Sequence, residues 1–507
     1  MKYYLVLLVA SLLVSCTSVP AVNSSKPNII YILADDLGYG DLSCLNANSK
    51  IKTANLDKLA SEGIYFTDAH SNSSVCTPTR YGVITGRYSW RSRLKKGVLG
   101  GTSTHLIKPE RMTVADLLKK QGYHTAMIGK WHLGWDFTFD NKKKIDFTKP
   151  VKNGPDANGF DYYYGHCGSL DMPPYVYVEN GSVTAAPDRI TANKGKGFWR
   201  KGSTGADFKH IDVLPNFFNR AEKYIDERAK IGEPFFLYSP IPAPHTPILP
   251  IKQFQGKSKT NLYGDFVMQV DWHVGQIMDN LKKNGLDQNT IVIFTSDNGC
   301  SPMANFKELE KLGHQPSDIY RGHKADIFEG GHRVPFIVHW PKKISAGSVS
   351  NEIICLTDLM ATAADLHNVK LPDNAAEDSV SFLPELLGEK RVQPLREATV
   401  HHSINGSFAI RQGDWKLILC PGSGGWSAPR PKRAFKNKTL PLIQLYNLKK
   451  DPSEKNNVYK AQTAKVTQLF QLLKKYVENG RSTPGKIQSK EGKTTFIPKG
   501  FDITKMR

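Results

Sequence analysis

The sequence is poor in the features that mark several common classes of protein. No two of its seven cysteines stand at a zinc-ligand spacing such as C-x-x-C, and no internal repeat is present. Beyond residue 15, no uncharged apolar run approaches the length of about 20 residues that a membrane-spanning helix needs. These absences argue against a zinc-binding module, a repeat protein and a protein with several membrane-spanning helices.

The N-terminus predicts export. Residues 1–15 have the pattern of a signal peptide, with Lys2 ahead of a short apolar run. The tetrapeptide L-V-S-C that ends at Cys16 resembles a bacterial lipobox, which implies cleavage before Cys16 and lipid attachment to it. Residues 16–26 would then be a lipidated tether, and a plain cleaved signal is the alternative. We expect a protein of the bacterial periplasm or cell envelope that touches the membrane only through this anchor.

Acidic residues are in deficit. The chain has 47 aspartates and glutamates against 68 lysines and arginines, a formal net charge of +21. Nucleic acid suits such a balance, but the basic residues are scattered, no recognition motif accompanies them, and an exported protein meets little nucleic acid. We therefore expect no nucleic-acid partner. A polyanionic substrate fits the charge, and a merely solvated basic surface is the alternative.

Apolar runs of strand length alternate with amphipathic helical segments over most of the chain. The expected strands are residues 28–34, 124–128, 235–239, 290–295 and 334–340. The expected helices are residues 54–63, 114–121, 217–231 and 266–284. This alternation predicts an α/β fold in which helices cover both faces of a mostly parallel sheet.

The pattern changes after a polar connection at residues 370–395. A hairpin over residues 407–419 with a Gly413-Asp414 turn, a strand at 442–448 and a helix at 464–477 predict a small antiparallel sheet with a packed helix. The expected divisions after the tether are a catalytic domain at 27–385, a C-terminal subdomain at 395–485 and a basic tail at 486–507.

Polar side chains follow four of the expected strands directly. They are Asp35-Asp36, Lys130 and His132, His245, and Asp297-Asn298. Because ligands of open parallel sheets lie outside the carboxyl ends of the strands, these side chains should meet at one edge. Three carboxylates close together repel unless a cation holds them, and oxygen ligands suit Ca²⁺ or Mg²⁺ better than zinc.

A short motif adds a nucleophile and further cations. Cys76 begins C-T-P-T-R, which ends at Arg80 and is followed by T-G-R. A cysteine ahead of a proline in a first helical turn lies where helix N–H groups attract anions. With Lys324, the cationic side chains Arg80, Lys130, His132 and His245 would surround a small tetrahedral anion.

These motifs together resemble the sulfatase family. The C-x-P-x-R and T-G-R pattern is its signature, with Ile84 where the family usually has leucine. The remaining matches are A-D-D-L-G-Y-G-D, G-K-W-H-L-G, P-A-P-H-T-P, T-S-D-N-G and R-G-H-K-A-D-I-F-E-G-G, spread between residues 27 and about 459. The chain is similar to bacterial carbohydrate sulfatases and N-acetylgalactosamine-6-sulfatase-like enzymes. The resemblance implies the alkaline-phosphatase-like α/β fold.

The resemblance also implies the site. Cys76 would be oxidised to formylglycine by a formylglycine-generating or anaerobic sulfatase-maturating enzyme. Asp35, Asp36, Asp297 and Asn298 would bind Ca²⁺ together with modified Cys76. With Cys16 and Cys76 so used, five cysteines remain, an odd number that cannot all pair, so the chain is not a disulfide scaffold.

The implied catalytic residues are Cys76, Arg80, Lys130, His132, His245 and Lys324. One hydroxyl of the hydrated aldehyde would attack sulfur, while His245 with Lys324 protonates the leaving alcohol. His132 would take the proton of the second hydroxyl as sulfate leaves and the aldehyde is restored. Cations and metal would stabilise the charge on the sulfuryl oxygens.

The organic part of the substrate is harder to identify from the chain. We expect a sulfated carbohydrate, with galactose or N-acetylgalactosamine units favoured. The candidate contacts lie in irregular loops and the second domain: Arg93, His166, Asp171, His401, His402 and the ring of Trp426. Three alternatives stay open: a phosphonate or phosphate ester hydrolase of the same superfamily, a non-catalytic glycan-binding lipoprotein, and a surface adhesion protein.

Overall fold

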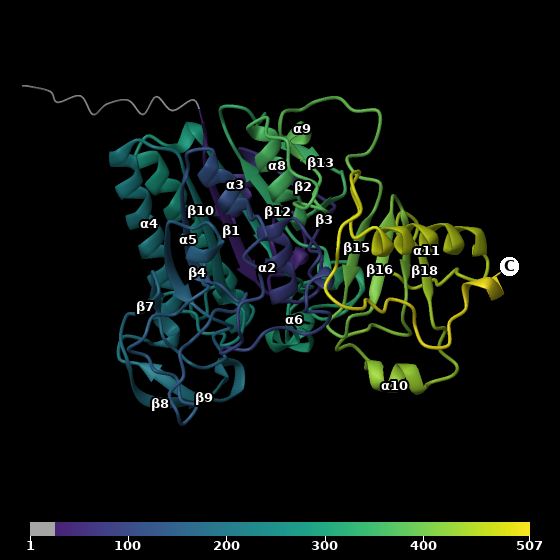
Figure 1. Cartoon of the computed structure of the whole chain (residues 1–507), viewed down its shortest axis with the longest axis horizontal. Coiled ribbons are helices and arrows are strands. Elements are labelled where there is room, and N and C mark those ends of the chain that lie inside the picture. The colour runs from purple at the N-terminus through teal and green to yellow at the C-terminus, as the bar shows by residue number, and fades with distance from the viewer. Residues whose placement is uncertain (1–25, 507) are drawn as a thin grey trace, which may run out of the picture.

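The computed structural model describes residues 26–506 and centres on a ten-stranded sheet (Figure 1). Its strand order is β13-β2-β12-β11-β1-β10-β4-β5-β6-β7. The middle strands are β11 (Thr290–Ser296), β1 (Asn28–Asp35), β10 (Phe235–Pro244) and β4 (His124–Lys130), all parallel to their neighbours in this group. Every residue of β1, β10 and β11 is buried, as strands covered on both faces require. The predicted parallel sheet is confirmed.

Different helices cover the two faces of the sheet (Figure 1). Alternate residues of β1 point to opposite sides, so that Tyr31 and Ile30 belong to separate hydrophobic cores. The helices in the Tyr31 core are α2 (Cys76–Thr85), α3 (Val114–Lys120) and α8 (Leu359–Leu366). Those in the Ile30 core are α1 (Ala54–Ser61), α4 (Val213–Ile231) and α5 (Leu262–Lys283).

The outer strands depart from the parallel pattern. β12 (Phe336–His339) is antiparallel to β11 and to β2 (Ile64–Phe66), and β13 (Ser348–Ser350) is parallel to β2. The apolar run at 334–340 predicted a strand, and β12 confirms it. An apolar run does not show in which direction a strand runs, so the antiparallel orientation was not predicted. The other edge consists of β5 (Tyr162–His166), β6 (Val178–Glu179) and β7 (Ser182–Val183).

The remaining elements are short. Two further pairs of strands are β8 (Pro187–Asn193) with β9 (Trp199–Gly205), and β3 (Ala69–His70) with β14 (Ile354–Cys355). The short helices are α6 (Phe306–Lys311), α7 (Glu329–His332), α9 (Leu383–Leu386) and α10 (Pro431–Lys436).

The C-terminal part forms a second sheet beside the first (Figure 1). Its four antiparallel strands are β15 (Thr399–His402), β16 (Phe408–Gln412), β17 (Trp415–Ile418) and β18 (Gln444–Asn447). Helix α11 (Thr463–Glu478) packs on it through Leu469, which shares a core with Ile410 and Leu417. The predicted hairpin, last strand and helix are confirmed, and β15 is an additional strand. The residue limits assigned to the domains stay predictions.

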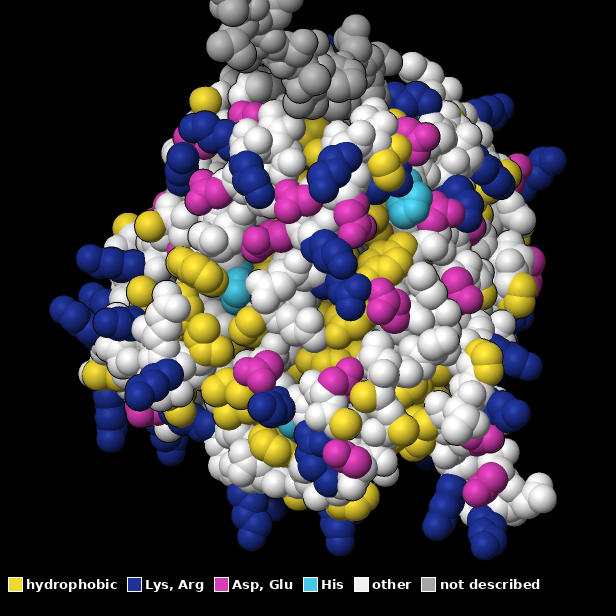
Figure 2. Space-filling view, turned by 90° about the vertical axis from the view of Figure 1, so that its left-hand side faces the viewer, with side chains coloured by type: hydrophobic (Ala, Val, Ile, Leu, Met, Phe, Trp, Pro, Cys, Tyr) yellow, Lys and Arg dark blue, Asp and Glu magenta, His cyan; other side chains and the backbone are white. Residues whose placement is uncertain are grey.

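The basic tail returns to this subdomain. Phe496 lies against Phe470, with ring centroids 5.9 Å apart, and the Glu491 N–H donates to the Arg91 carbonyl at 2.8 Å. Up to residue 506, where the described part of the chain ends, the tail forms one regular element, a 3-10 helix at Ile503–Met506. On the face drawn in Figure 2, basic side chains are interspersed with acidic ones, so charge is spread and not gathered there.

The signal peptide, Cys16 and the tether up to residue 25 lie outside the described residues. Within residues 26–506, the helices are all too short or too polar to cross a membrane. The six cysteines of this range are all free thiols.

Candidate active site

The four central strands bring their predicted polar residues to one edge of the sheet. Asp35 ends β1 and pairs with Pro244 of β10, directly before His245. Lys130 ends β4, and Asp297 follows β11. Asp35, Lys130 and Asp297 are fully buried, and the His245 side chain is 11% exposed. The convergence expected from the strand order is therefore confirmed.

Helix α2 adds Cys76 and Arg80 to this edge. Cys76 is its first residue, and the Cys76 Sγ lies 3.6 Å from the Asp35 Oδ1. Arg80, one turn further on, donates from Nε at 3.0 Å and from a terminal nitrogen at 2.8 Å to Asp297. The helix ends at Thr85, and the φ of +63° at the next residue, Gly86, lets the chain turn away from it.

Each carboxylate of the cluster has its own cation. Arg80 binds Asp297 as described, Lys130 donates to Asp35, and the Lys324 Nζ lies 2.7 Å from the Asp36 Oδ1. Lys130 also donates to the Ser169 hydroxyl at 2.8 Å. Three acidic side chains thus face three basic ones in a buried space. There, an ion pair is stable only if its geometry offsets the lost hydration of both groups.

The carboxylates nevertheless crowd one another. Burial, and after it the neighbouring Asp35 carboxylate, raise the pKa of Asp297 to about 7. Burial also raises the pKa of Asp35, but the cations Lys130, His245 and Arg80 outweigh it and hold that pKa well below its usual range. Two carboxylates this close repel each other when both are ionised, and a bound cation would relieve that repulsion.

Further groups fit a hard metal ion. The Asn298 side chain donates to Asp36 at 2.7 Å, while its carbonyl oxygen is buried with no hydrogen-bond partner among the described residues. Ligand atoms of Asp35, Asp36, Cys76 and His245 lie within 4.8 Å of one another. Asp297, held by Arg80, stands outside that group. The donor set is mostly oxygen, as Ca²⁺ or Mg²⁺ requires.

His132 is held as a neutral base. Its Nε2–H donates to the Leu99 carbonyl at 2.8 Å, which leaves Nδ1 with a free lone pair and no partner among the described residues. Burial, then Lys130 and Arg80, lower the pKa of His132 well below its usual value. His245 is arranged differently: its Nδ1 faces the Thr246 carbonyl, and its Nε2 lies 3.6 Å from the Asp36 Oδ2.

The Cys76 side chain is a protonated thiol at neutral pH. Burial raises its pKa to about 12, although Lys130 and Lys324 lower it. A thiolate, the reactive form of cysteine, is therefore disfavoured here. A catalytic group at position 76 would therefore have to act without ionisation of the thiol.

A cavity of about 520 Å³ opens beside His245 and Lys324. Asp171, Phe198 and Trp426 also line it, so the prediction that Asp171 and Trp426 reach the mouth of the site is supported. Asp171 forms an ion pair with Arg200. The cavity is open to solvent and reaches the buried cluster at Lys324 and His245, as a substrate site requires.

The other candidate substrate residues are placed elsewhere. Arg93 is exposed and donates to the carbonyls of Thr104 and His105. His166 is buried and stacks on Phe217. None of Arg93, His166, His401 and His402 lines the cavity at Lys324.

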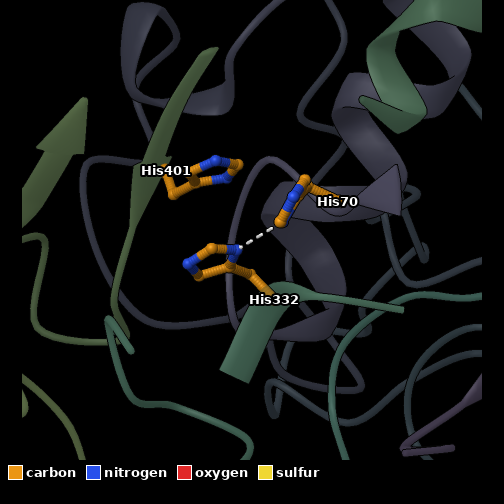
Figure 3. Close-up of side chains that lie close together, drawn as sticks. All are labelled: His70, His332 and His401. Atoms are coloured by element: carbon orange, nitrogen blue, oxygen red, sulfur yellow. Dashed lines mark hydrogen bonds between the residues drawn. The ribbon is translucent and has the colours of Figure 1, made fainter. Parts of the chain in front are cut away.

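His401 belongs to a second buried cluster, which Figure 3 shows with His70 of β3 and His332 of α7. The His332 and His401 rings stack with centroids 3.9 Å apart, and the Nδ1 atoms of His70 and His332 are 3.0 Å apart. The Lys416 ammonium donates to the His332 Nε2 at 3.0 Å. His332 Nδ1–H therefore points at His70, and both ring nitrogens of His70 and His332 have partners within the protein, whereas the His401 Nε2 is buried without a partner among residues 26–506.

His402 is equally enclosed, with its Nδ1 facing the Ser403 carbonyl. The doublet at 401–402 lies on β15, a strand of the second domain that the sequence did not predict. The expectation that His401 and His402 contact the sugar is therefore corrected: both are buried and neither lines the cavity.

Several residues at the cavity carry no signal of their own in the sequence. Phe198, His323 and Arg430 line it, and Arg200 pairs with Asp171 of its wall. Phe198 and Arg200 come from the irregular region 136–210, where no periodicity marks a position as inward-facing.

Comparison with known proteins gives the same answer as the geometry. Residues 27–369 match the family model Sulfatase. The N-acetylgalactosamine-6-O-sulfatase of Bacteroides thetaiotaomicron is 37% identical over 492 residues, which cover 89% of this chain and 93% of that protein.

Two solved structures are similar over most of their length. One, from work on the metabolism of multiple glycosaminoglycans by Bacteroides thetaiotaomicron, has a TM-score of 0.78 and 35% identity, covering 89% of this chain and 99% of that one. The other, Ps i-CgsB in complex with k-i-k-neocarrahexaose, has a TM-score of 0.68 and 25% identity, covering 92% of this chain and 95% of that one.

The fold is the alkaline-phosphatase-like fold of hydrolases, with a buried charged cluster at the carboxyl ends of its central strands. The chain belongs to the sulfatase family, and it is an enzyme that hydrolyses sulfuric esters. Sulfatases in general use a formylglycine and a divalent metal ion, and the buried cluster of acidic residues and His245 could hold that metal.

Proposed function

We propose that this sulfatase removes a sulfate group from a sulfated glycan, with 6-O-sulfated N-acetylgalactosamine or galactose as the favoured unit. The observation that carries the proposal is the position of Cys76 in the buried cluster: its Sγ lies 3.6 Å from the Asp35 Oδ1, it feels the charges of Lys130 and Lys324, and Lys324 in turn lines the cavity. The preference for the sugar is supported by the N-acetylgalactosamine-6-O-sulfatase relative.

We assign the metal to Ca²⁺ and its ligands to Asp35, Asp36, Asp297, Asn298 and modified Cys76. The unpartnered Asn298 oxygen and the raised pKa of Asp297 support this assignment, because both are relieved by a cation. A bound divalent ion would polarise the sulfuryl oxygens and favour ionisation of a nearby hydroxyl.

Formylglycine at Cys76 would supply a hydrated aldehyde with two hydroxyls. One hydroxyl would attack sulfur as the alcohol leaves. Loss of the proton of the second hydroxyl would restore the aldehyde as sulfate leaves. Cys76 is only 2% exposed, so the maturation enzyme would have to reach it before the chain folds. The protonated state of the thiol supports the modification, since an unmodified Cys76 makes a weak nucleophile.

The chain's own residues would divide the remaining work. Arg80, Lys130 and Lys324 would bind the sulfate oxygens with charge-assisted hydrogen bonds. His245, next to Lys324 at the cavity, would give a proton to the leaving alcohol. The free Nδ1 of His132 would accept a proton during sulfate release.

The cavity walls would bind the sugar. Asp171 is held by Arg200 and can accept hydrogen bonds from sugar hydroxyls, and the rings of Phe198 and Trp426 offer apolar faces. Export through the signal peptide and lipid attachment at Cys16 would place the enzyme in the periplasm or cell envelope.

A panel of defined sulfated sugars tests the proposal. Released sulfate is measured by ion chromatography for the 6-sulfates of N-acetylgalactosamine, galactose and N-acetylglucosamine and for N-acetylgalactosamine 4-sulfate. The 6-sulfates of the two galacto-configured sugars should give the highest kcat/KM. Faster turnover of nitrophenyl phosphate than of every sulfate ester would favour the phosphate or phosphonate hydrolase.

The modification is tested separately. Mass spectrometry of the Cys76 peptide should show a loss of about 18 Da, the difference between cysteine and formylglycine. An unmodified peptide from active enzyme would remove formylglycine from the mechanism.

A further inference from the structure

A second hollow adjoins the cavity on the side of the C-terminal subdomain. Trp426 and Arg430 line both the cavity at Lys324 and a neighbouring hollow of about 670 Å³, where Pro429 and Arg433 complete the wall. A ligand in the cavity that extends past Trp426 therefore reaches these arginines. The hollow is within the size range of sites that bind small ligands.

The hollow carries uncompensated positive charge. No aspartate or glutamate occurs between Asp414 and Asp451, while Arg430, Lys432, Arg433, Lys436 and Lys438 fall within that stretch. Arg430 and Arg433 are exposed, and neither guanidinium forms an ion pair or hydrogen bond with any residue in the range 26–506. By contrast, Arg220 on another surface binds Glu179 at 2.9 Å.

The hollow is held in fixed relation to the catalytic residues. The N–H groups of Trp426 and Ser427 donate to the Asp326 carboxylate at 2.9 Å and 3.0 Å. Asp326 lies two residues after Lys324, and the Lys324 Nζ is 5.9 Å from the Trp426 ring centroid. A side chain on Gly425 would meet the Ala325 carbonyl at 2.3 Å, which shows how closely the two loops approach.

We infer that the hollow at Arg430 and Arg433 is a second anion site. It would bind a sulfate or carboxylate group of the sugar unit next to the one that loses its sulfate. Guanidinium groups bind such oxyanions through two parallel hydrogen bonds, and the Trp426 ring would lie against the sugar between the two anions. This inference rests on the proposed function, and it extends the substrate from one sulfated sugar to a polyanionic oligosaccharide.

The site should act on binding and not on chemistry. An interaction made equally with bound substrate and transition state lowers KM and leaves kcat unchanged. Because the arginines are exposed, their contribution should also weaken as salt is added.

The test uses the double variant Arg430→Gln/Arg433→Gln. Its matched control is Lys449→Gln/Lys450→Gln, which removes the same charge from two exposed side chains that do not line either hollow. The substrates are a disaccharide with one sulfate, the same disaccharide with a second sulfate on the neighbouring sugar, a uronate-containing counterpart, and nitrophenyl sulfate.

We expect KM for the doubly anionic disaccharides to rise about tenfold in Arg430→Gln/Arg433→Gln, which corresponds to about 1.4 kcal/mol. Their kcat should stay as in the wild type, and KM for the singly sulfated disaccharide and nitrophenyl sulfate should rise by much less than tenfold, because Arg430 lines the cavity but meets no second anion of these substrates. A response to only one of the two doubly anionic substrates would support the site and identify its anion. The second site would be overturned if the arginine variant changed KM equally for all substrates or for none. The same increase in the lysine control would also overturn it.

Binding is measured in parallel on the inactive Cys76→Ala protein by calorimetry with the doubly sulfated disaccharide. If this ligand binds and loses affinity with the two arginine substitutions, the second site stands even if the active enzyme releases no sulfate from it. If sulfate is released but the arginine substitutions change neither affinity nor KM, the proposed function stands and the second site is wrong.

Discussion

Of the buried charged clusters among residues 26–506, two are alike in composition and differ in their access to a cavity. The active-site cluster consists of Asp35, Asp36, Asp297, Arg80, Lys130 and Lys324. The sealed cluster consists of Asp68, Glu329, Glu454, Arg333, Arg411 and Lys416, with the histidines of Figure 3 beside it.

The two clusters are alike in charge. Each pairs three carboxylates with three basic side chains, and each contains one carboxyl whose pKa is raised. Burial, with Asp35 next, raises the pKa of Asp297 to about 7, and burial raises the pKa of Glu454 to about 7 although Lys416 lowers it. A perturbed pKa therefore does not distinguish catalysis from structure here.

Access and connection distinguish them. Lys324 and His245 line the cavity, whereas no member of the sealed cluster does. Lys416 of β17 binds both Glu329 at 3.0 Å and Glu454 at 2.9 Å, so the sealed cluster joins the C-terminal sheet to the loops of the large sheet. On the proposed function, one cluster would serve chemistry, while the other holds two parts of the protein together.

The largest expected effect concerns chemistry alone. Cys76→Ala should reduce sulfate release to the uncatalysed rate, because it removes the group that attacks sulfur. The free energy of unfolding should change by no more than about 1 kcal/mol. Sulfate release and urea unfolding measure the two effects, and residual turnover near that of the wild type would contradict the role of Cys76.

The next effect separates the two clusters through a pair of matched variants. Lys416→Met should lower the free energy of unfolding by about 3 to 5 kcal/mol, since two buried carboxylates lose their common partner. The folded fraction should keep its kcat and KM.

Lys324→Met is the control, because in Ca²⁺-containing buffer it should abolish turnover with a much smaller loss of stability. Loss of kcat in folded Lys416→Met, or equal destabilisation by both variants, would show that the division between the clusters is wrong.

Chelation should affect the active-site cluster only. Removal of Ca²⁺ by a chelator should lower the melting temperature and abolish sulfate release, and readdition should restore both, because a ligand of the native state stabilises it by about 2.7 kcal/mol at a hundredfold excess over Kd. Differential scanning calorimetry measures the shift. Asp36→Asn should show little or no shift, and a wild-type protein insensitive to exhaustive chelation would refute the metal assignment.

The smallest effect is the pH dependence of the sealed cluster. Because the folded-state pKa of Glu454 is raised to about 7, the stability that it contributes is present at low pH and is lost as pH rises through that value. We expect a loss of about 1 to 2 kcal/mol between about pH 6 and 8.

Glu454→Gln cannot ionise and should remove this slope in urea unfolding measured at several pH values in saturating Ca²⁺. An unchanged slope in Glu454→Gln would place the titrating group elsewhere.

The sequence predicted the active-site cluster well because its signals are local. Asp35, Lys130, His245 and Asp297 each follow a buried apolar run, and the topology rule for parallel strands brings the ends of such runs together. The spacing from Cys76 to Arg80 similarly needs only one helical turn.

The sealed cluster and the second anion site were not predicted for the opposite reason. Lys416 and Glu329 are 87 positions apart on different elements, and no local pattern reveals that their side chains meet. His401-His402 and Trp426 seemed equivalent candidates, yet the former face inward from β15 and the latter lines the cavity.

The sequence by itself determined the family, the parallel core of the sheet and the polar residues that meet at its edge, because motif spacing and apolar periodicity are properties of short segments. The tertiary structure alone decided which loops form the mouth, in which direction β12 runs and which charged groups are sealed. These depend on contacts between segments far apart in the chain, where packing and desolvation select one arrangement among many that the local patterns allow.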